Sequence, residues 1–228
     1  MPLADIRAVI DAYGAAAANA QSVGFDGVEI HAAHGYLIDQ FFWEKTNYRT
    51  DQYGGSLVAR TRFAADVVAE IRGRVGKAFP VALRFSQFKI EDYDARLAHT
   101  PAELDQFLAP LTDAGVDVFH ASARRFSDAA FTDSSLTLAG WTKKLTGRST
   151  IAVGSVSLGT DMMTSFGTDD PSGMNGIDSL LDCMERDEFD MIAVGRALIS
   201  NPEWPRIVQS GNPDRLQPFR RAALATLA

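Results

Sequence analysis

The sequence predicts an α/β fold built around a parallel sheet. Short apolar segments typical of strands begin near residues 27, 80, 116, 149 and 189, so that successive starts lie 33 to 53 residues apart. Helical patterns occupy the intervals, as in βα units that return the chain to the start of the next parallel strand. Of the 228 residues, 46% are hydrophobic and 22% are charged, which is the composition of a folded globular domain.

The first half of the chain contains two of these units. Apolar residues at helical spacing predict a helix over residues 5–23, and Gly24 supplies the left-handed residue that is common at helix ends. Gly27–His31 follows as a strand. A second helical pattern over residues 63–71 precedes the strand Pro80–Phe85.

The second half repeats the pattern. Thr100–Glu103 combines a capping box with proline at the first helical position, and therefore predicts the start of the helix that carries residues 104–111. Further strands are expected at residues 116–120, 150–154 and 190–195. The sequence thus contains five βα units.

Periodicity does not decide between an open doubly wound sheet and a closed (β/α)₈ barrel. A barrel typically takes about 250 residues, and eight units at the spacing seen here would need on the order of 320. An open sheet of five strands fits the length. In both architectures ligands bind at the C-terminal ends of the strands, so the residues that follow each strand are the candidates for function.

The charge balance excludes several classes of partner. Twenty-two Lys and Arg against twenty-nine Asp and Glu give a net charge of -7, with no basic run suited to nucleic acid or an anionic membrane. No apolar stretch approaches the roughly 20 residues that cross a bilayer, and no signal sequence is recognisable, so we expect a cytoplasmic protein. Cys183 is the single cysteine, which excludes an internal disulfide, and we expect it to be a buried thiol.

The first predicted strand ends in His31, His34 and Tyr36. Two imidazoles and a phenol so close together can donate hydrogen bonds to one ligand oxygen and supply a weak acid, as a site that polarises a carbonyl group requires. A structural histidine beside a packed tyrosine is the alternative. A metal site that adds Glu29 is disfavoured, because no other strand end carries a ligand-rich segment, and no metal is expected.

Arg84 lies within an apolar strand, where burial of an unpaired guanidinium would be costly. An anionic or strongly accepting group should therefore face it, either a structural carboxylate or the anionic edge of a cofactor. The long polar loop Asn47–Ser56 is expected to be a solvated surface loop with a turn at Gly54–Gly55. The alternative is that Asp51 and the arginines brace one another and hold the preceding loop in place.

The last two predicted strands end in Gly154–Ser155 and Gly195–Arg196. Glycine allows backbone N–H groups to approach a phosphate, and arginine adds charge-assisted hydrogen bonds. Barrels often bind phosphate after their last two strands, so this pair favours a barrel. Neither a GxGxxG motif nor a Walker A sequence is present, which argues against a dedicated nicotinamide domain and against a nucleoside triphosphatase. His120, after the third strand, is expected to be a packed structural residue.

Taken together, these segments resemble the Old Yellow Enzyme family of NADH:flavin oxidoreductases, and the resemblance spans essentially the whole chain. It rests on Gly24–Leu37, Asn47–Ser56, Leu83–Ser86, Ala139–Trp141, Val153–Ser155 and Ala193–Arg196. The family fold is an FMN-binding (β/α)₈ TIM barrel, and by this likeness the five strands are the fourth to the eighth. The resemblance therefore implies that residues 1–228 form a single partial TIM-barrel domain without the first three strands.

The resemblance also implies roles for the strand-end residues. His31 and His34 would bind the carbonyl oxygen of an activated alkene, and Tyr36 would protonate its α-carbon. Arg84 would face the pyrimidine edge of the flavin. The phosphate of FMN would be held by Gly154, Ser155, Gly195 and Arg196. NAD(P)H would reduce the flavin in the same pocket.

We therefore expect an FMN-dependent ene-reductase that uses NAD(P)H to reduce activated C=C bonds of α,β-unsaturated carbonyl compounds. One alternative is a catalytically incompetent fragment or assembly subunit of such an enzyme. Another is a flavin-free phosphate-binding barrel lyase or isomerase that uses His31 and Tyr36 as acid and base. The open edges of a partial barrel also predict self-association or a complementing chain.

Overall fold

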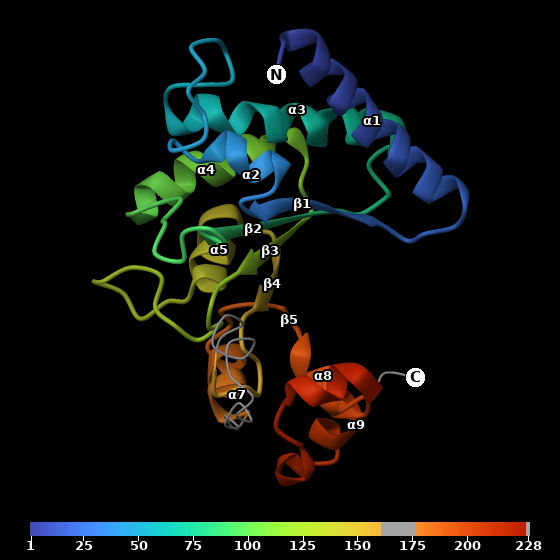
Figure 1. Cartoon of the computed structure of the whole chain (residues 1–228), viewed down its shortest axis with the longest axis vertical. Coiled ribbons are helices and arrows are strands. Elements are labelled where there is room, and N and C mark those ends of the chain that lie inside the picture. Colours follow the sequence, from blue (N-terminus) through green and yellow to red (C-terminus); the bar gives the residue numbers. More distant parts are fainter. Residues whose placement is uncertain (161–176, 227–228) are drawn as a thin grey trace. The chain divides into compact units, whose positions relative to one another are not determined.

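The computed structural model describes residues 1–160 and 177–226 (Figure 1). Its strands are hydrogen-bonded in the order in which they follow one another along the chain. They are β1 (Val28–His34), β2 (Val81–Lys89), β3 (Val118–Ser122), β4 (Ser149–Val153) and β5 (Met191–Ala193). The longer helices are α1 (Leu3–Ser22), α3 (Leu57–Val75), α4 (Pro101–Ala114), α5 (Leu138–Thr146) and α7 (Asp178–Glu185). The shorter ones are α2 (Leu37–Phe42), α8 (Arg196–Ser200), α9 (Trp204–Gln209) and the 3-10 helices η1 (Pro213–Arg215) and η2 (Arg221–Thr226).

The predicted order of helices and strands is confirmed. Each of the five strands begins within two residues of its predicted start, and α1 begins two residues before the predicted helix. The short helix α2, which follows β1, was not predicted. Among the helices of the described part of the chain, none is long and apolar enough to cross a membrane.

The chain divides into two compact units. Unit 1 comprises Met1–Ala121 and Trp141–Thr150, and unit 2 comprises Ser122–Gly140 and Ile151–Ala228. Unit 1 contains β1, β2 and most of β3, whereas unit 2 contains β5 and most of β4. The single partial barrel domain expected from the sequence stays a prediction.

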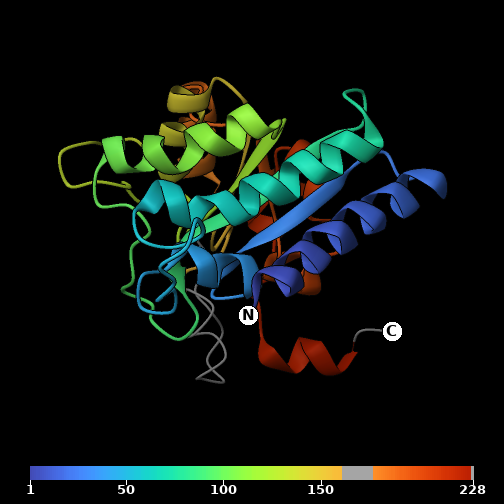
Figure 2. The ribbon, with the colours of Figure 1, turned by 90° about the horizontal axis from the view of Figure 1, so that it is seen from above.

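Three helices cover one face of the strands in unit 1. Figure 2 shows α1, α3 and α4 side by side over β1 and β2. Between these layers, the ring of Phe107 lies 5.4 Å from that of Phe85 and 4.9 Å from that of Phe42. All three side chains are buried. Because burial of a phenylalanine stabilises a fold by roughly 1.5 to 3 kcal/mol, these rings fix the helices against the strands.

The start of α4 follows from its sequence. Thr100 Oγ1 accepts the N–H of Glu103 at 3.1 Å, and Pro101 occupies the first turn, as predicted. The carboxylate of Glu103 accepts the N–H of His99 at 2.7 Å rather than that of Thr100. The return bond of the capping box is thus shifted by one residue, although the helix begins where the sequence indicates.

The pairing of β1 with β2 sets which side chains share a face. The two strands are parallel, with Ile30 opposite Leu83 and His31 opposite Arg84. Ile30 and Leu83 are buried, whereas His31 is exposed. Successive side chains in a strand point to opposite faces. The helices therefore cover the face of Ile30, and the other face carries His31 and Arg84.

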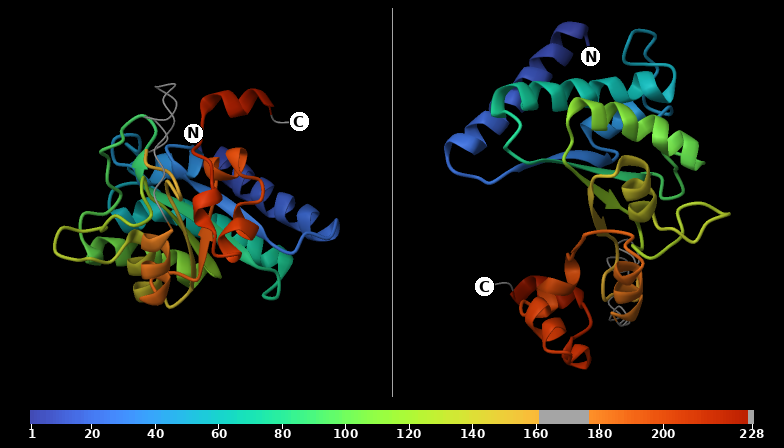
Figure 3. Two further views of the ribbon diagram at one scale, coloured as in Figure 1. Left: turned by 90° about the horizontal axis from the view of Figure 1, so that it is seen from below. Right: turned by 180° about the vertical axis from the view of Figure 1, so that it is seen from behind.

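Unit 2 is built on the parallel pair β4 and β5, in which Ala152 lies opposite Ile192. Trp204 of α9 is buried and donates its Nε1–H to the hydroxyl of Ser157 at 3.0 Å. Helix α8 lies next to η2 and α9 next to η1, and Figure 3 draws these elements in orange and red. Cys183 of α7 is buried, as expected, and burial raises the pKa of its thiol.

Candidate active site

β1 ends in a bulge that turns the chain. Its pairing with β2 is regular up to Ala32 and then slips, so that His34 lies opposite Lys89. His34 has a φ of 64° and Gly35 a φ of 86°, both in the left-handed region. For a residue with a side chain this conformation costs free energy, which the surrounding structure must offset. We refer to these two residues as the His34–Gly35 turn.

The turn brings together three residues that the sequence singled out. The ring centre of His31 lies 5.6 Å from that of His34 and 5.0 Å from that of Tyr36. We call these three residues the ring cluster. His34 also stacks on Phe88 of β2 at 5.1 Å. Tyr36 is 54% exposed, so the alternative interpretation of a packed core tyrosine is wrong.

Burial and a nearby cation keep both imidazoles of the ring cluster neutral at pH 7. Burial, followed by the charge of Arg84, lowers the pKa of His34 to about 4. The same two causes lower the pKa of His31. A neutral imidazole donates through one ring nitrogen and accepts through the other. The cluster therefore offers N–H donors without a positive charge of its own.

Both backbone groups of His34 are bonded to the β2 segment. The N–H of His34 donates to Ser86 Oγ at 2.9 Å, and its carbonyl accepts the N–H of Ile90 at 3.3 Å. The buried hydroxyl of Ser86 in turn donates to the carbonyl of Phe88 at 2.7 Å. The β2 segment thus fixes the first residue of the turn.

Gly35 is held by a buried ion pair that the sequence analysis missed. Its N–H donates to Asp39 Oδ2 at 2.6 Å, and Asp39 Oδ1 accepts from Lys89 Nζ, also at 2.6 Å. Neither charged side chain has any solvent exposure. A Cβ at position 35 would lie 2.5 Å from Glu91 Oε2. The exposed Glu91 side chain could move aside, so it is the positive φ that makes glycine the residue suited to the position.

A second interaction that the sequence analysis missed joins Glu29 to His120. Nδ1 of His120 lies 2.8 Å from Glu29 Oε2. Burial raises the pKa of Glu29, but the hydrogen bond with His120 and the charges of His120, Arg84 and His31 bring it below its ordinary value. His120 is 7% exposed, which confirms the packed structural histidine that we expected.

Arg84 lies on the same face of the strands as His31, its register partner. Burial lowers the pKa of its guanidinium, and the charge of Glu29 opposes this effect. The carboxylate of Glu29 therefore favours the charged form of Arg84. This agrees with the interpretation that a structural carboxylate faces the guanidinium. The second interpretation, a cofactor edge, stays a prediction.

The long polar loop after α2 is braced by its own side chains, as in the alternative interpretation of its sequence. Arg49 and Asp51 are joined by two hydrogen bonds of 3.0 and 2.5 Å between guanidinium and carboxylate. The side-chain amide of Asn47 donates to the carbonyls of Phe41 and Tyr53, at 2.7 Å each. The loop is thereby tied to α2, the helix that follows the ring cluster.

In unit 2, Gly154 follows β4 in a conformation that leaves no room for a side chain. Its φ is 155°, and a Cβ would lie 2.3 Å from the carbonyl oxygen of Ala123 and 2.9 Å from the backbone nitrogen of Phe126. Ser155 has a φ of 49°, and its hydroxyl donates to the carbonyl of Arg124 at 2.8 Å. These contacts explain the glycine by close packing. The predicted phosphate contacts of both residues stay predictions.

Gly195 and Arg196 lie at the start of α8. Within residues 1–160 and 177–226, and apart from its two chain neighbours, no residue has an atom within 4 Å of the place that a Cβ of Gly195 would occupy. An Nη of Arg196 donates to the carbonyl of Thr160 at 3.3 Å, and the guanidinium lies 5.9 Å from the ring centre of Phe219. All four predicted phosphate residues belong to unit 2, whereas the ring cluster and Arg84 belong to unit 1.

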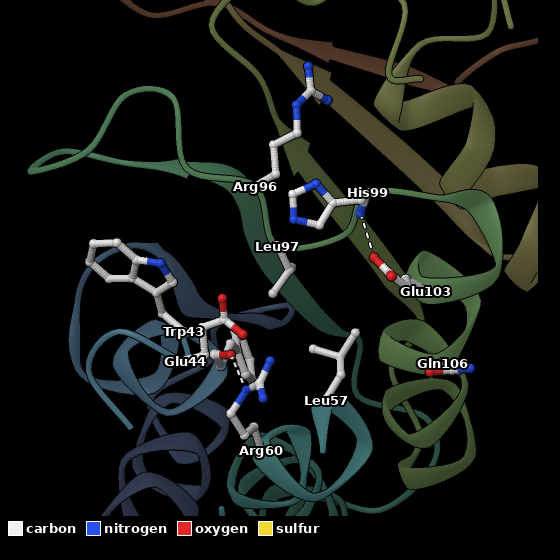
Figure 4. Close-up of a pocket in the computed structure, with 10 residues that line it drawn as sticks. Trp43, Glu44, Leu57, Arg60, Arg96, Leu97, His99, Glu103 and Gln106 are labelled. Carbon is white, nitrogen blue, oxygen red and sulfur yellow. Dashed lines mark hydrogen bonds between the residues drawn. The ribbon is translucent and has the colours of Figure 1, made fainter. Parts of the chain in front are cut away.

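Figure 4 shows a different cavity of unit 1, of about 220 Å³. Trp43, Arg60, His99 and Glu103 are among the residues that line it, and none of the predicted site residues is. Arg60 has a structural role here, since it donates to the carbonyl of Phe42 at 2.7 Å. Over residues 1–160 and 177–226, no group of three or more His, Cys, Asp or Glu side chains is arranged to hold a metal ion.

Comparison with known proteins identifies the family. The model of the NADH:flavin oxidoreductase / NADH oxidase family matches residues 1–215. The chain belongs to this family. The resemblance predicted from the sequence motifs is thereby confirmed, and FMN with NAD(P)H as reductant is the cofactor set that membership implies.

The relatives extend beyond the length of this chain. The NADH oxidase of Thermoanaerobacter brockii is 32% identical over 221 residues, which are 93% of this chain and 31% of that protein. A cinnamate reductase of Clostridium sporogenes is 54% identical over 83 residues, which are 36% of this chain and 12% of that protein. The solved structure of morphinone reductase in complex with tetrahydroNAD is 24% identical with a TM-score of 0.72, and the match covers 98% of this chain and 53% of that one. The chain thus spans about half of a TIM-barrel enzyme, which confirms the predicted fold class.

The donor set of unit 1 suits a flavin. Arg84 is a half-buried guanidinium whose register partner is His31 of the ring cluster. A guanidinium offers several N–H donors in a fixed plane, which matches the hydrogen-bond acceptors on the pyrimidine edge of an isoalloxazine. These residues therefore fit FMN.

Proposed function

We propose that this chain carries the alkene-binding part of an FMN-dependent ene-reductase, which uses NAD(P)H to reduce activated C=C bonds of α,β-unsaturated carbonyl compounds. The observation that carries the proposal is the ring cluster at the C-terminal end of β1, beside Arg84. Barrel enzymes keep their active sites at this end of the strands. Family membership supports flavin chemistry, and the similarity to a cinnamate reductase supports a conjugated alkene as substrate.

His31 and His34 bind the carbonyl oxygen of the substrate. Because burial and Arg84 lower their pKa values, both are neutral at pH 7 and each can donate one N–H. Negative charge builds up on this oxygen when the β-carbon accepts hydride, so the two hydrogen bonds strengthen in the transition state. Loss of one such donor typically slows a reaction by about 100-fold or more.

Tyr36 supplies the proton for the α-carbon. Its ring lies 5.0 Å from that of His31, and more than half of the side chain is exposed. The hydroxyl is therefore accessible to a substrate held by the two histidines. FMN, when bound, supplies the hydride for the β-carbon and takes it up from NAD(P)H.

Each unit carries its own residues that we assign to cofactor contacts. The guanidinium of Arg84 holds the pyrimidine edge and stabilises negative charge there. The phosphate is bound through backbone N–H groups and a guanidinium, by Gly154, Ser155, Gly195 and Arg196.

Tyr36→Phe tests this assignment, because it removes the proton and keeps the ring. In FMN-loaded protein we expect alkene reduction to slow by at least about 100-fold, since a general acid typically contributes that much. Flavin reduction by NAD(P)H should be nearly unchanged. Stopped-flow absorbance of the flavin measures the two half-reactions separately. Tyr48→Phe is the matched control, because Tyr48 is 82% exposed and lies outside the ring cluster; it should leave both rates as in wild type.

Other outcomes would favour the alternatives. Equal losses in both half-reactions would contradict Tyr36 as the proton donor. Turnover of a phosphorylated substrate by flavin-free protein would contradict the proposal as a whole and favour a lyase or isomerase. A purified chain that takes up no FMN would favour a fragment or assembly subunit.

A further inference from the structure

A lysine and an aspartate are closed off from solvent next to the His34–Gly35 turn. Lys89 is the last residue of β2 and Asp39 lies in α2. Both side chains are 0% exposed, and Lys89 Nζ lies 2.6 Å from Asp39 Oδ1. Charged side chains are almost never fully buried unless they are paired. Strand β2 and helix α2 therefore each contribute one buried charged side chain next to the His34–Gly35 turn.

Stability alone does not account for this pair. Taking two charges out of water is costly, and a buried ion pair is often no more stabilising than apolar residues of similar volume. An apolar pair would, however, lack an acceptor for the N–H of Gly35, which Asp39 Oδ2 accepts at 2.6 Å. The aspartate is thus needed for the turn rather than for packing.

Lys89 favours the charged form of this acceptor. Burial raises the pKa of Asp39 and lowers that of Lys89, and the charge and hydrogen bond of each partner oppose the effect of burial on the other. The carboxylate of Glu91 acts on both, raising the two pKa values. A charge-assisted hydrogen bond is roughly twice as strong as a neutral one. The lysine therefore strengthens the hold of Asp39 on Gly35.

We propose that Lys89 and Asp39 are positioning residues for the proposed reaction, on which this inference rests. Their ion pair anchors the His34–Gly35 turn in its left-handed conformation. The conformation of this segment sets the distances between the rings of the cluster. These are 5.6 Å between the two imidazoles and 5.0 Å between the rings of His31 and Tyr36. The pair acts on the substrate through the cluster, without touching the substrate itself.

The protonation of His34 reports on the pair. Burial and the charge of Arg84 are the main causes of its low pKa, and the charges of His31, Lys89 and His120 add to them. Loss of Lys89 removes one of these cations. Release of the turn also exposes the ring of His34 to solvent. This weakens the effect of burial, which is the largest cause of its low pKa. Both effects raise the pKa of His34.

Two double variants separate the acceptor from the charge. Lys89→Met with Asp39→Asn removes both charges and keeps a side-chain oxygen for the N–H of Gly35. Lys89→Met with Asp39→Leu removes the acceptor as well. Lys45→Gln is the control, because it breaks an exposed ion pair with Asp92, of 2.8 Å, in the same unit.

The measurements use the purified chain without flavin or substrate. They are hydrogen exchange at the Gly35 amide and the pH titration of His34, both by NMR, and the free energy of unfolding in urea. In the leucine variant we expect exchange at Gly35 to be at least about tenfold faster than in wild type and the pKa of His34 to rise, without a matching loss of stability. The asparagine variant should restore slow exchange, and Lys45→Gln should match wild type in all three.

Unchanged exchange at Gly35 in the leucine variant would overturn the proposal. Rapid exchange of this amide in the wild-type chain would overturn it too, and this result does not depend on whether a variant folds. In FMN-loaded protein, slower alkene reduction by the leucine variant with unchanged flavin reduction would support it. A chain that binds no FMN would contradict the proposed function but not the anchoring of the turn, because the exchange and titration need no cofactor.

Discussion

Acidification should destabilise the fold through His34. In the folded chain, burial and the charge of Arg84 lower the pKa of His34 from its ordinary 6.5 to about 4. Between these two pH values the unfolded chain binds a proton at this residue and the folded chain does not. The free energy of unfolding therefore falls as the pH drops through this window, and the contribution of His34 is fully present above pH 6.5.

The size of the effect follows from the two pKa values. At about 1.36 kcal/mol per pH unit, the complete window corresponds to at most about 3.4 kcal/mol. The ring is only partly buried, so solvent screening reduces this to about 1 to 2 kcal/mol. This remains a large part of the stability of a typical domain, which is about 5 to 15 kcal/mol.

Urea unfolding at pH 7 and pH 4.5 measures this contribution. His34→Gln replaces the imidazole by a neutral group that does not titrate, so we expect this variant to lose about 1 to 2 kcal/mol less than wild type between the two pH values. His99→Gln is the control, because His99 is an exposed histidine of the same unit, and it should lose as much as wild type. Equal losses in wild type and His34→Gln, or an NMR titration of His34 near 6.5, would refute the reasoning.

Two further predictions concern packing. Gly154→Ala should lower the free energy of unfolding by about 2 kcal/mol or more, because its Cβ would lie 2.3 Å from the carbonyl oxygen of Ala123. Gly73→Ala, in helix α3 at a position with open space around the Cβ, should not lower it, because alanine favours the helix more than glycine does. Equal losses for the two variants in urea unfolding would contradict the packing argument. Phe85→Ala should lower the free energy of unfolding by about 3 to 5 kcal/mol, because this ring is fully buried beside Phe107. A decrease of less than about 1 kcal/mol would show that the aromatic layer does not hold helices and strands together.

Local patterns in the sequence were sufficient for most of the fold. The periodicity of α1 and the Thr100–Pro101 start of α4 depend only on neighbouring residues, so they could be read directly. Helix α2 has only six residues, too few to show helical periodicity. The bulge between Ala32 and His34 exists only because β1 pairs with β2, and pairing between distant segments is not encoded locally.

The site was only partly predictable for the same reason. The ring cluster lies within six consecutive positions, so a single motif revealed it. Asp39 and Lys89 are 50 positions apart, and a buried charge has the same sequence signature as an exposed one. The sequence of β2 does not set this lysine apart, because the strand also carries Arg84, Ser86 and Gln87. Glu29 and His120, 91 positions apart, could have been suspected from strand alternation, which places Glu29 on the face of His31.

The most direct test of the central claim is a titration of FMN fluorescence with the purified chain and its Arg84→Met variant. Arg84 is the residue of unit 1 assigned to the flavin, and methionine preserves the bulk of its apolar stem without the charge. We predict saturable quenching at one FMN per wild-type chain. The dissociation constant of the variant should be at least about tenfold higher, since loss of a charge-assisted hydrogen bond typically weakens binding by at least that factor. Saturable binding that Arg84→Met leaves unchanged, or no saturable quenching by wild type, would contradict the claim that these strand ends form a flavin site.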